Sequence, residues 1–312
     1  MKSIPEGLDK NFEILLISRK SKKKKSNKIN FKNIIIASNI FSYLFNIFRT
    51  FRNKRKKYLI ISITPYTFFA YLILFIFKKK IFLYLRSEGH EESKAILGFF
   101  GSLIYRVMFT TVTFKSHIIT CQKRLFVEKK SNLVFPSELD SLWFNNKQIA
   151  LTEKPRLLYV GRIKVEKGIF SFLKIFNAIE TDMQFSVVGR IEDVNLNNKK
   201  INFLGHIDDP AKLVEIYDDH NIFVLPSFTE AHPKVIDESL ARNRPVIIFE
   251  EIKHVIQNRK GIFVSKRNLK SFIETVNFIM KNYENIQENI NKNKLPTKKE
   301  FISQMDNILS SN

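Results

Sequence analysis

The chain has 312 residues, 44% of them hydrophobic, which allows a sizeable core and favours two domains over one. Only 9 glycines, 9 prolines and an absence of repeats exclude a fibrous or disordered protein, and the single Cys121 excludes an internal disulfide and a cysteine-rich metal site. The net charge of +22 predicts attraction to a polyanion, whether nucleic acid, an anionic membrane or a phosphate-bearing substrate.

Much of the positive charge lies near the N-terminus, where residues 1–57 hold 16 Lys and Arg against three acidic residues, an excess of 13. An anionic membrane surface is the partner that we expect, and nucleic acid is disfavoured. The alternative for individual lysines is that they only solvate the surface. Residues 1–10 are polar and the apolar stretch 14–17 is too short for a signal sequence. We therefore expect a cytoplasmic protein, peripheral on the inner face of the plasma membrane.

Two long apolar runs, 66–77 and 95–114, test whether the chain crosses a membrane. A span needs about 20 apolar residues, and the first run is too short. The second contains Arg106 and is followed by Lys115, which favours a buried or interfacial helix.

In the first half of the chain, short apolar runs typical of strands alternate with stretches of helical spacing. Strands are predicted at 12–18, 33–37, 58–63, 81–85, 117–121 and 132–135, and helices at 40–51, 66–77 and 95–114. A polar segment without periodicity, 145–155, follows, and we place the domain boundary within it.

The alternation restarts after Pro155. Strands are predicted at 156–160, 184–188, 201–203, 222–225 and 245–249, and helices at 169–179, 210–217 and 234–241. This order indicates an α/β fold with a doubly wound parallel sheet. We predict two Rossmann-like domains, 1–148 and 149–295, facing across a cleft, and a C-terminal helix in 296–312 that packs back on the first domain. Ligands should bind at the carboxyl ends of the strands.

The first motif with chemical meaning is the segment 159–168, a strand that ends at Gly161 and continues through a basic loop into a helix. Glycine lets the backbone approach a ligand closely. Arg162 and Lys167 bring two positive charges that suit a diphosphate, with arginine able to bind it in a bidentate manner. Taken alone, the segment is equally consistent with a solvated turn.

The second motif lies within 225–247 and places Glu230 and Glu238 eight positions apart. Glu230 falls in the loop after a predicted strand, and Glu238 about one turn inside the next helix, so that both can face one ligand. We expect a sugar to contact Glu230 and the ribose diol to donate to the carboxylate of Glu238. Free amides around Pro233, Lys234 and Val235 would complement the diphosphate.

In these motifs, residues from about 156 to 280 resemble the GT4 family of retaining glycosyltransferases, which have the GT-B fold. The family has a Gly-Arg…Lys-Gly loop and a Glu-x7-Glu signature, matched here by 161–168 and 230–238. The resemblance implies that Arg162 and Lys167 stabilise the leaving diphosphate, with transfer that retains the anomeric configuration. It also implies that Glu230 contacts the donor sugar and Glu238 holds the ribose.

Further site residues follow from the same resemblance. The strand ending at Gly189 fits the family layout, and His206 and Ile207 match residues that flank the base. A histidine after the strand at 81–85 contacts the donor sugar in the family, which makes His90 a candidate catalytic residue beside Arg162, Lys167 and Glu230. The alternative is that His90 is an exposed loop histidine, and Arg86 and Glu88 are equally open as groups that bind an acceptor or fix the loop. The donor-binding set is Gly161, Gly189, His206, Ile207, Pro233, Lys234, Val235 and Glu238.

Three departures from the family pattern bear on the site. The glycine-rich loop after the first strand is replaced by the basic segment 19–25. Asn243 stands where the family commonly has glycine before the last strand of this region, and asparagine tolerates the left-handed conformation needed there. After the first glutamate the family commonly has a small residue, an apolar residue and proline, whereas segment 231–233 reads Ala-His-Pro. We therefore expect the sugar pocket to differ.

No His/Cys cluster has metal-ligand spacing, and neither an Asp-x-Asp motif nor a nucleotide-hydrolase, dinucleotide or esterase motif occurs. We therefore expect a glycosyltransferase without metal or cofactor, moving a sugar from a nucleotide-diphosphate sugar to a glycan or lipid-linked acceptor in polysaccharide biosynthesis. Inverting transfer on the same fold is one alternative. The other is a catalytically inactive protein of this fold that binds a membrane surface or a polyanion.

Overall fold

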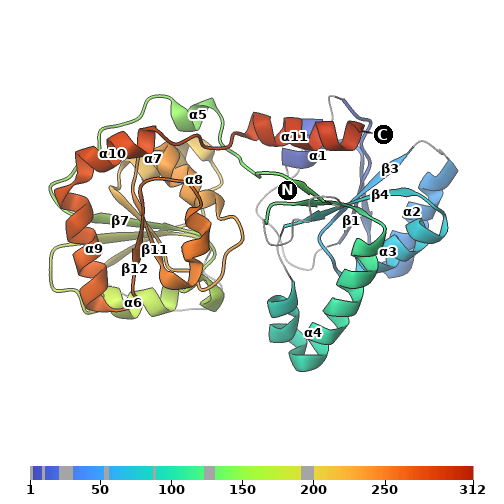
Figure 1. The fold of residues 1–312 in the computed structure, drawn as a ribbon, viewed down its shortest axis with the longest axis horizontal. Coiled ribbons are helices and arrows are strands. Elements are labelled where there is room, and N and C mark those ends of the chain that lie inside the picture. The colour runs from blue at the N-terminus through green and yellow to red at the C-terminus, as the bar shows by residue number, and fades with distance from the viewer. Residues whose placement is uncertain are drawn as a thin grey trace. The chain divides into compact units, whose positions relative to one another are not determined.

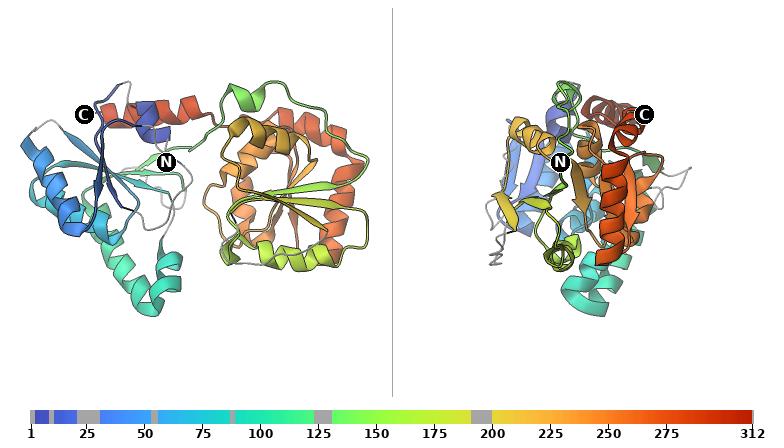
Figure 2. Two further views of the ribbon diagram at one scale, coloured as in Figure 1. Left: turned by 180° about the vertical axis from the view of Figure 1, so that it is seen from behind. Right: turned by 90° about the vertical axis from the view of Figure 1, so that its left-hand side faces the viewer.

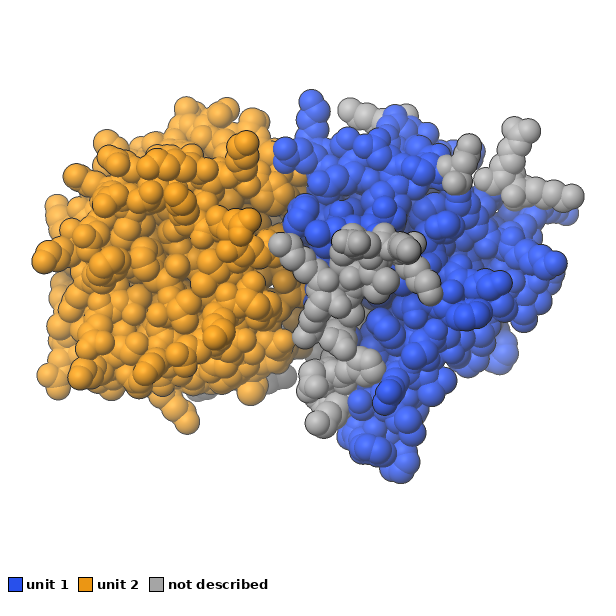
Figure 3. All heavy atoms as spheres, viewed as in Figure 1, with its two compact units in different colours: residues 1–136, 299–312 blue, residues 137–298 orange. Residues whose placement is uncertain are grey.

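The structure, a computed structural model, describes residues 3–8, 11–20, 31–52, 56–86, 89–122, 131–190 and 200–311. It contains two compact units, coloured separately in Figure 3. Unit 1 comprises Met1–Pro136 and Lys299–Asn312, and unit 2 comprises Ser137–Lys298. Every strand pairing in the described residues is parallel, so the predicted α/β class is confirmed (Figure 1).

Unit 2 is built on a six-stranded parallel sheet in the order β12-β11-β10-β7-β8-β9. Its strands are β7 (Arg156–Val160), β8 (Gln184–Val188), β9 (Ile201–Gly205), β10 (Ile222–Leu225), β11 (Val246–Phe249) and β12 (Ile262–Ser265). The strand order reverses between β7 and β10. From β7 the chain continues to β8 and β9 on one side of the sheet, and from β10 it continues to β11 and β12 on the other. In open α/β sheets such a switch point is where ligands bind, just beyond the carboxyl ends of the strands.

Helices cover both faces of the unit 2 sheet (Figures 1 and 2). On one face, rings of Phe172 and Phe272 pack together and against the sheet residues Phe185 and Phe249. The helices of this unit are η3 (Val165–Lys167), α5 (Ser141–Phe144), α6 (Ile169–Asn177), α7 (Pro210–Asp218), α8 (Lys234–Ala241), η4 (Glu250–Ile256), α9 (Leu269–Lys281) and α10 (Tyr283–Asn291). Phe172 lies on α6 and Phe272 on α9, so these two helices share that face.

Unit 1 has a four-stranded parallel sheet, β3-β4-β5-β6, and a separate parallel pair, β1-β2. Its strands are β1 (Leu16–Arg19), β2 (Ile34–Ala37), β3 (Lys57–Ile61), β4 (Lys80–Leu85), β5 (His117–Thr120) and β6 (Ser131–Leu133). Successive side chains of a strand point to opposite faces. Accordingly, Leu83 and Leu85 of β4 join one apolar cluster, while Phe82 and Tyr84 join another.

These two clusters separate the helices of unit 1 into two layers. The first cluster includes Tyr43, Leu74 and Val112, one from each of three helices on the same face of the sheet. The second includes Leu8 and Met305, from helices at opposite ends of the chain. The helices are α1 (Ser3–Leu8), α2 (Ile40–Arg49), η1 (Thr50–Arg52), α3 (Pro65–Ile76), α4 (His90–Phe114) and α11 (Lys298–Ser310). Helices α2, α3 and α4 thus form one layer, and α1 and α11 the other (Figure 1).

Most predicted elements are confirmed within a few residues, and β7, β8, β10 and α8 agree at both ends. The buried strands are continuous apolar runs, which makes them easy to recognise. The short helix α5 was missed, because it has only four residues, and its capping by Asp140, whose side chain accepts from the Leu142 amide, is a purely local signal. Helices α1, α9 and α10, strand β12 and the 3₁₀ helix η4 were not predicted.

The boundary between the units lies at Pro136, twelve residues before the predicted position. Two buried arginines explain the difference. Arg242 donates from Nη1 to the carbonyls of Trp143 and Asn145 at 3.0 and 2.8 Å, and Arg244 donates from Nη2 to the carbonyl of Gln148 at 3.0 Å. These bonds make the polar segment before β7 part of unit 2. At the other end, Lys298 rather than residue 295 is the last residue of unit 2.

None of the helices within the described residues is long and apolar enough to cross a membrane. Helix α4 has the greatest length among them, 25 residues, and it is bent (Figure 2). Within it, Gly98 has a left-handed backbone with φ of 62°.

Candidate active site

The predicted motifs meet at the carboxyl ends of β7 and β10, neighbouring strands of the unit 2 sheet. The basic loop follows β7, and the loop that carries Glu230 follows β10. The two loops are joined directly, because the Phe228 amide donates to the carbonyl of Glu166 at 3.1 Å. Gly168, at the end of the basic loop, has φ of 65°, and a Cβ there would lie 1.8 Å from the carbonyl oxygen of Pro226. Only glycine allows this approach.

Lys167 and Glu230 form the central contact of the site. The ammonium of Lys167 donates to Oε1 of Glu230 at 2.6 Å, and the hydroxyl of Ser227 donates to the same oxygen at 2.7 Å. The two charged side chains are only 19% and 11% exposed, so the pair is shielded from solvent. The Glu230 carbonyl lies 2.9 Å from Nε2 of His254, which fixes the backbone beneath the carboxylate.

Arg162 is placed differently from Lys167. Its side chain is 65% exposed, and the nearest carboxylate, Glu166, lies 4.0 Å away. Its backbone is fixed, since the hydroxyl of Tyr159 donates to the Arg162 carbonyl at 2.7 Å. Burial and then the nearby Glu230 carboxylate raise the pKa of Tyr159, so the hydroxyl keeps its proton and remains a donor. The guanidinium is thus exposed to solvent, whereas its attachment point is held.

The glycines at the ends of β7 and β8 pack against each other. A Cβ on Gly189 would lie 2.0 Å from the carbonyl oxygen of Gly161. The Gly161 amide donates to Val188, and the Gly189 amide donates to Gly205 at the end of β9. The predicted role of Gly189 in donor binding stays a prediction. The structure shows that the absence of a side chain on Gly189 lets the ends of β7, β8 and β9 approach one another.

Glu238 lies on α8, partly buried beside the preceding helix. The hydroxyl of Tyr217 on α7 donates to Oε2 of Glu238 at 3.1 Å. Burial raises the pKa of Glu238 to about 7, outweighing the Tyr217 hydrogen bond and the Lys234 charge, which both lower it. Glu238 is therefore a carboxyl group that can change its protonation state near neutral pH.

The N-terminus of α8 begins after Pro233, and no side chain caps it. The Ile236 amide donates back to the Pro233 carbonyl at 3.1 Å. The helix start carries the positive end of the helix dipole, together with the ammonium of Lys234, which pairs with Glu138 at 2.8 Å. The predicted diphosphate-binding residues 233–235 thus lie on the same helix as Glu238, next to the loop of Glu230.

His206 and Ile207 follow β9, at the edge of the sheet. Nε2 of His206 lies 2.9 Å from Oδ1 of Asp208, which orients the ring, and both side chains are exposed. Ile207 packs against the unit 2 core. The Gly189–Gly205 hydrogen bond connects this turn to the end of β8. His90 is the first residue of α4 in unit 1, and its side chain lies outside the described residues.

His232 occupies the position where the sequence departs from the family pattern. Its side chain is buried, and Nε2 lies 3.4 Å from Oδ2 of Asp237 on α8, a carboxylate that also pairs with Arg259 at 2.5 Å. The imidazole of the loop after Glu230 thus lies against α8, although neither Nε2 of His232 nor Oδ2 of Asp237 has a hydrogen-bond partner among the described residues.

Arg267 was missed by sequence reasoning, and it supports the loop that carries Ser227 and Glu230. Its guanidinium lies between the rings of Phe228 and Phe249, 4.2 and 4.4 Å from their centroids. Nη2 donates to the Pro226 carbonyl at 3.0 Å, and Nε donates to Glu251 at 2.8 Å. The hydrogen bond from Arg267 lowers the pKa of Glu251. No motif surrounds Arg267 in the sequence, so no sequence signal indicates it.

Replacing Arg267 by lysine should destabilise unit 2 by about 1–3 kcal/mol, because an ammonium cannot fill the slot between two rings and reach both acceptors. Urea unfolding followed by circular dichroism measures this change. The neighbouring Lys266→Ala, which removes an exposed side chain, is the control and should leave the midpoint unchanged. If Arg267→Lys unfolded at the wild-type midpoint, the contacts of Arg267 with the Phe228 and Phe249 rings would contribute nothing to stability.

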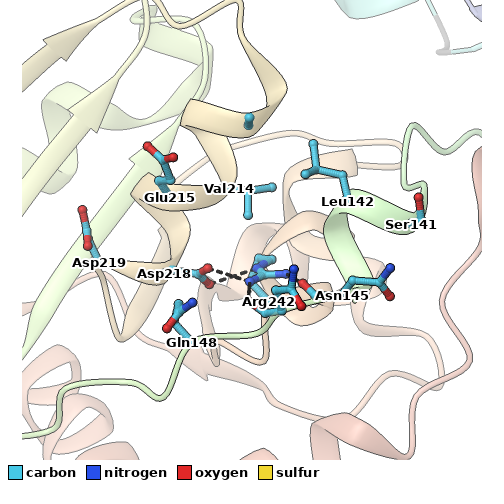
Figure 4. Close-up of a pocket in the computed structure, with 11 residues that line it drawn as sticks. Ser141, Leu142, Asn145, Gln148, Val214, Glu215, Asp218, Asp219 and Arg242 are labelled. Atoms are coloured by element: carbon cyan, nitrogen blue, oxygen red, sulfur yellow. Dashed lines mark hydrogen bonds and ion pairs between the residues drawn. The ribbon is translucent and has the colours of Figure 1, made fainter.

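Two cavities in unit 2 lie away from the predicted site. The first, of about 610 Å³, is lined by α5, one side of α7, and the Asp218–Arg242 ion pair (Figure 4). The second, of about 790 Å³, is lined by the amino-terminal residues Arg156 and Gln184 of β7 and β8. Neither includes a predicted site residue. Arg242 in the first cavity is already committed to carbonyls and to Asp218, which indicates a structural role.

Comparisons with known proteins place residues 154–282 in a family model described as "Glycosyl transferases group 1". CapM of Staphylococcus aureus, a capsular polysaccharide biosynthesis glycosyltransferase, is 28% identical over 151 residues, 43% of this chain and 39% of that protein. An N,N'-diacetylbacillosaminyl-diphospho-undecaprenol alpha-1,3-N-acetylgalactosaminyltransferase of Campylobacter jejuni is 26% identical over 167 residues, 50% of this chain and 43% of that protein. The matched segments thus span about two fifths of these relatives.

Solved structures match over nearly the whole chain. Sucrose-phosphate synthase of Thermosynechococcus elongatus superimposes with a TM-score of 0.75 at 16% identity, covering 99% of this chain and 91% of that one. WaaG, a glycosyltransferase involved in lipopolysaccharide biosynthesis, gives a TM-score of 0.70 at 12% identity, covering 99% and 95%. HepE of Anabaena, solved with UDP and glucose, gives 0.69 at 11% identity, covering 89% and 86%. The chain therefore has the GT-B fold of glycosyltransferases, and residues 154–282 of its second unit match the glycosyl transferases group 1 family model.

Proposed function

We propose that this chain is a retaining glycosyltransferase of the GT4 kind, which moves a sugar from a nucleotide-diphosphate sugar to a glycan or lipid-linked acceptor. The observation that carries the proposal is the shielded Lys167–Glu230 pair beside α8, at the end of the sheet where its strand order reverses. A structural neighbour solved with UDP and glucose supports a nucleotide-sugar donor. One relative is named for capsular polysaccharide and another for an undecaprenol-linked acceptor, which supports a role in polysaccharide biosynthesis.

In the proposed reaction, the bond between the anomeric carbon and the leaving phosphate oxygen breaks while an acceptor oxygen attacks from the same face. The acceptor proton passes to an oxygen of the departing diphosphate, so no protein nucleophile is needed. Lys167 has three donors, so it can keep Glu230 and still contact the diphosphate. Arg162 is exposed, and it adds a second charge as the leaving group becomes more negative.

Glu230 and Glu238 position the donor in this proposal. Glu230, held by Lys167 and Ser227, orients the sugar, and ionised Glu238 accepts from the two ribose hydroxyls. The amides at the start of α8 add a helix dipole at the diphosphate. His206 and Ile207 would flank the base, and His90 stays a candidate sugar contact from unit 1.

Metal removal should leave activity intact, because two cationic side chains and a helix N-terminus supply the charge stabilisation that a divalent ion would otherwise give. Turnover of dialysed enzyme in excess EDTA is expected within about twofold of turnover in Mg²⁺ or Mn²⁺. A loss of activity in EDTA that Mn²⁺ restores would overturn this part of the proposal.

The donor is identified by thermal unfolding in a panel of UDP-, GDP- and ADP-sugars, because a ligand that binds only the folded state raises Tm by mass action. One nucleotide is expected to stabilise the protein, and the same sugar nucleotide should support transfer. Proton NMR of the product then gives the anomeric configuration. A product of inverted configuration would exclude the retaining assignment while leaving glycosyl transfer in place.

The second candidate is an inactive protein of this fold that binds a polyanion or a membrane surface. Unit 1 holds 28 Lys and Arg against nine acidic residues, an excess of 19, whereas unit 2 holds 24 against 21. The charge imbalance favours a polyanionic partner for unit 1, but it does not bear on whether unit 2 binds a donor. Absence of stabilisation by every nucleotide sugar in the panel would favour this candidate over the enzyme.

A further inference from the structure

The outward side of the α2, α3 and α4 layer in unit 1 is apolar, although the layer already buries its inward side against the sheet. On α2, Tyr43 and Ile47 are buried, and Phe41, Phe45 and Phe48 are exposed on the opposite side, with Phe41 80% exposed. The spacing of four and three residues puts the three phenylalanines in one stripe. A soluble helix normally presents polar residues there.

Helix α3 continues the same surface. Its residues Tyr71 and Leu74 face the sheet, whereas Phe69 and Ile76 lie on the far side, with Ile76 70% exposed. Seven residues correspond to almost two helical turns, so these two side chains align. The ring of Phe77, just beyond α3, meets that of Phe48 edge-on at 5.4 Å, which joins the stripes of α2 and α3.

Helix α4 carries a third stripe. Tyr105 and Val112 are buried, and Leu103, Val107 and Phe114 are exposed on the opposite side. Because α2, α3 and α4 all bury the other side against one face of the unit 1 sheet, their exposed stripes look outward from the same layer. We call the outward sides of these three helices the outer apolar face.

Cations accompany the outer apolar face, and acids are missing from the sequence around its α2 and α3 parts. The guanidinium of Arg49 lies 5.9 Å from the ring centroid of Phe45, and the ammonium of Lys115 lies 6.0 Å from that of Phe114. Residues 14–87, which include α2 and α3, contain 18 Lys and Arg and no Asp or Glu. The combination of exposed phenylalanine, isoleucine and leucine with flanking cations is typical of proteins that insert into a membrane interface.

We propose that the outer apolar face binds an anionic lipid bilayer, with α2, α3 and α4 inserted at the interface and the surrounding lysines and arginines on the lipid headgroups. A second copy of the chain is a poorer occupant, because two surfaces of a unit with an excess charge of +19 repel each other. A nucleic acid would pair with the cations but would leave the exposed aliphatic side chains in contact with water. The proposal goes beyond the glycosyltransferase assignment, and it is tested without turnover.

Co-flotation of the full chain with vesicles measures the interaction. Binding is expected to an equal mixture of phosphatidylcholine and phosphatidylglycerol, to be much weaker with phosphatidylcholine alone, and to decline with added NaCl. The triple variants F41S/F45S/F48S and L103S/V107S/F114S should each reduce binding about tenfold or more, because they remove only apolar contact area. All six positions are exposed, so thermal unfolding should match that of the wild type.

A matched control is I149S/L151S, which removes two exposed apolar side chains of unit 2 and should float like the wild type. Unchanged flotation of both triple variants, or equal binding to neutral vesicles, would overturn the proposal. The proposal would also be overturned if the wild type bound no vesicles and the triple variants still bound RNA. Loss of concentration-dependent self-association in the variants, without vesicle binding, would assign the face to a dimer instead.

Depth is measured with tryptophan and brominated lipid, which quenches only side chains within the bilayer. Ile76→Trp is expected to be quenched in vesicles containing brominated phosphatidylglycerol, and Ile149→Trp is not. Trp143 is buried in unit 2 and contributes the same background to both. Failure of donor binding would leave this result untouched, because unit 2 supplies the nucleotide site and unit 1 the lipid-binding face.

Discussion

Replacing Glu230 by glutamine is expected to reduce kcat by about 100- to 1000-fold, with the protein still folded. Glutamine keeps the shape of the side chain and can still accept from Ser227, but it lacks the charge that pairs with Lys167 at 2.6 Å. Lys167 would then be drawn to the diphosphate in the ground state as well as in the transition state. The loss should therefore appear in kcat more than in KM.

Lys167→Ala tests the other half of the pair, and the double variant tests their coupling. Because the two side chains act as a unit, the losses in kcat/KM should be far from additive. Glu274→Gln, an exposed glutamate on α9, is the matched control and should keep wild-type kinetics. Near-normal turnover of both Glu230→Gln and Lys167→Ala, measured with the donor found by thermal unfolding, would remove these residues from the active site.

The second large effect concerns the pH dependence of donor affinity through Glu238. Its pKa is raised to about 7, mainly by burial, so at pH 6 only about a tenth of the carboxyl groups are ionised and able to accept from both ribose hydroxyls. Affinity for the nucleotide sugar should rise about tenfold between pH 6 and pH 8. Isothermal titration calorimetry at several pH values measures this, and Glu238→Gln should bind weakly with a flat profile.

Ionisation of Glu238 has the opposite effect on folding stability: donor affinity should rise with pH, whereas stability should fall. Since the folded-state pKa lies above its ordinary value of 4.5, the folded protein binds a proton more tightly than the unfolded chain does. Stability relative to Glu238→Gln should therefore fall as pH rises from about 4.5 to about 7, by at most about 3 kcal/mol. A wild type and variant with parallel pH–stability curves, together with a flat binding profile in the wild type, would contradict the assignment of a titrating Glu238.

The sequence predicts the donor half well, because its strands are apolar runs and its polar motifs fall directly after them. It does not separate Arg162 from Lys167, since both are cations in one short loop. Their difference in burial arises from contacts between loops that are distant in sequence, such as Lys167 with Glu230. Arg267 escapes prediction for a related reason: its partners are two phenylalanine rings and a backbone carbonyl, none of which forms a motif with it.

The domain boundary illustrates the same limit. Arg242 and Arg244 follow α8, and they fix a segment about a hundred positions earlier by bonding to its backbone carbonyls, which any residue type possesses. Asn243 between them was expected to adopt a left-handed conformation, and its φ of 61° confirms that. Backbone conformation can thus be predicted from one residue type, whereas a long-range bond to a carbonyl cannot.

The path of the chain through the two units has a practical consequence for engineering. Unit 1 is formed from both ends of the sequence, and α11 supplies Phe301 and Met305 to its core. Unit 2 is a single uninterrupted segment, Ser137–Lys298. A chimera that exchanges this one segment for its counterpart from a relative, leaving both ends of the chain in place, transfers the whole of unit 2 while keeping each unit 1 core residue with its own partners.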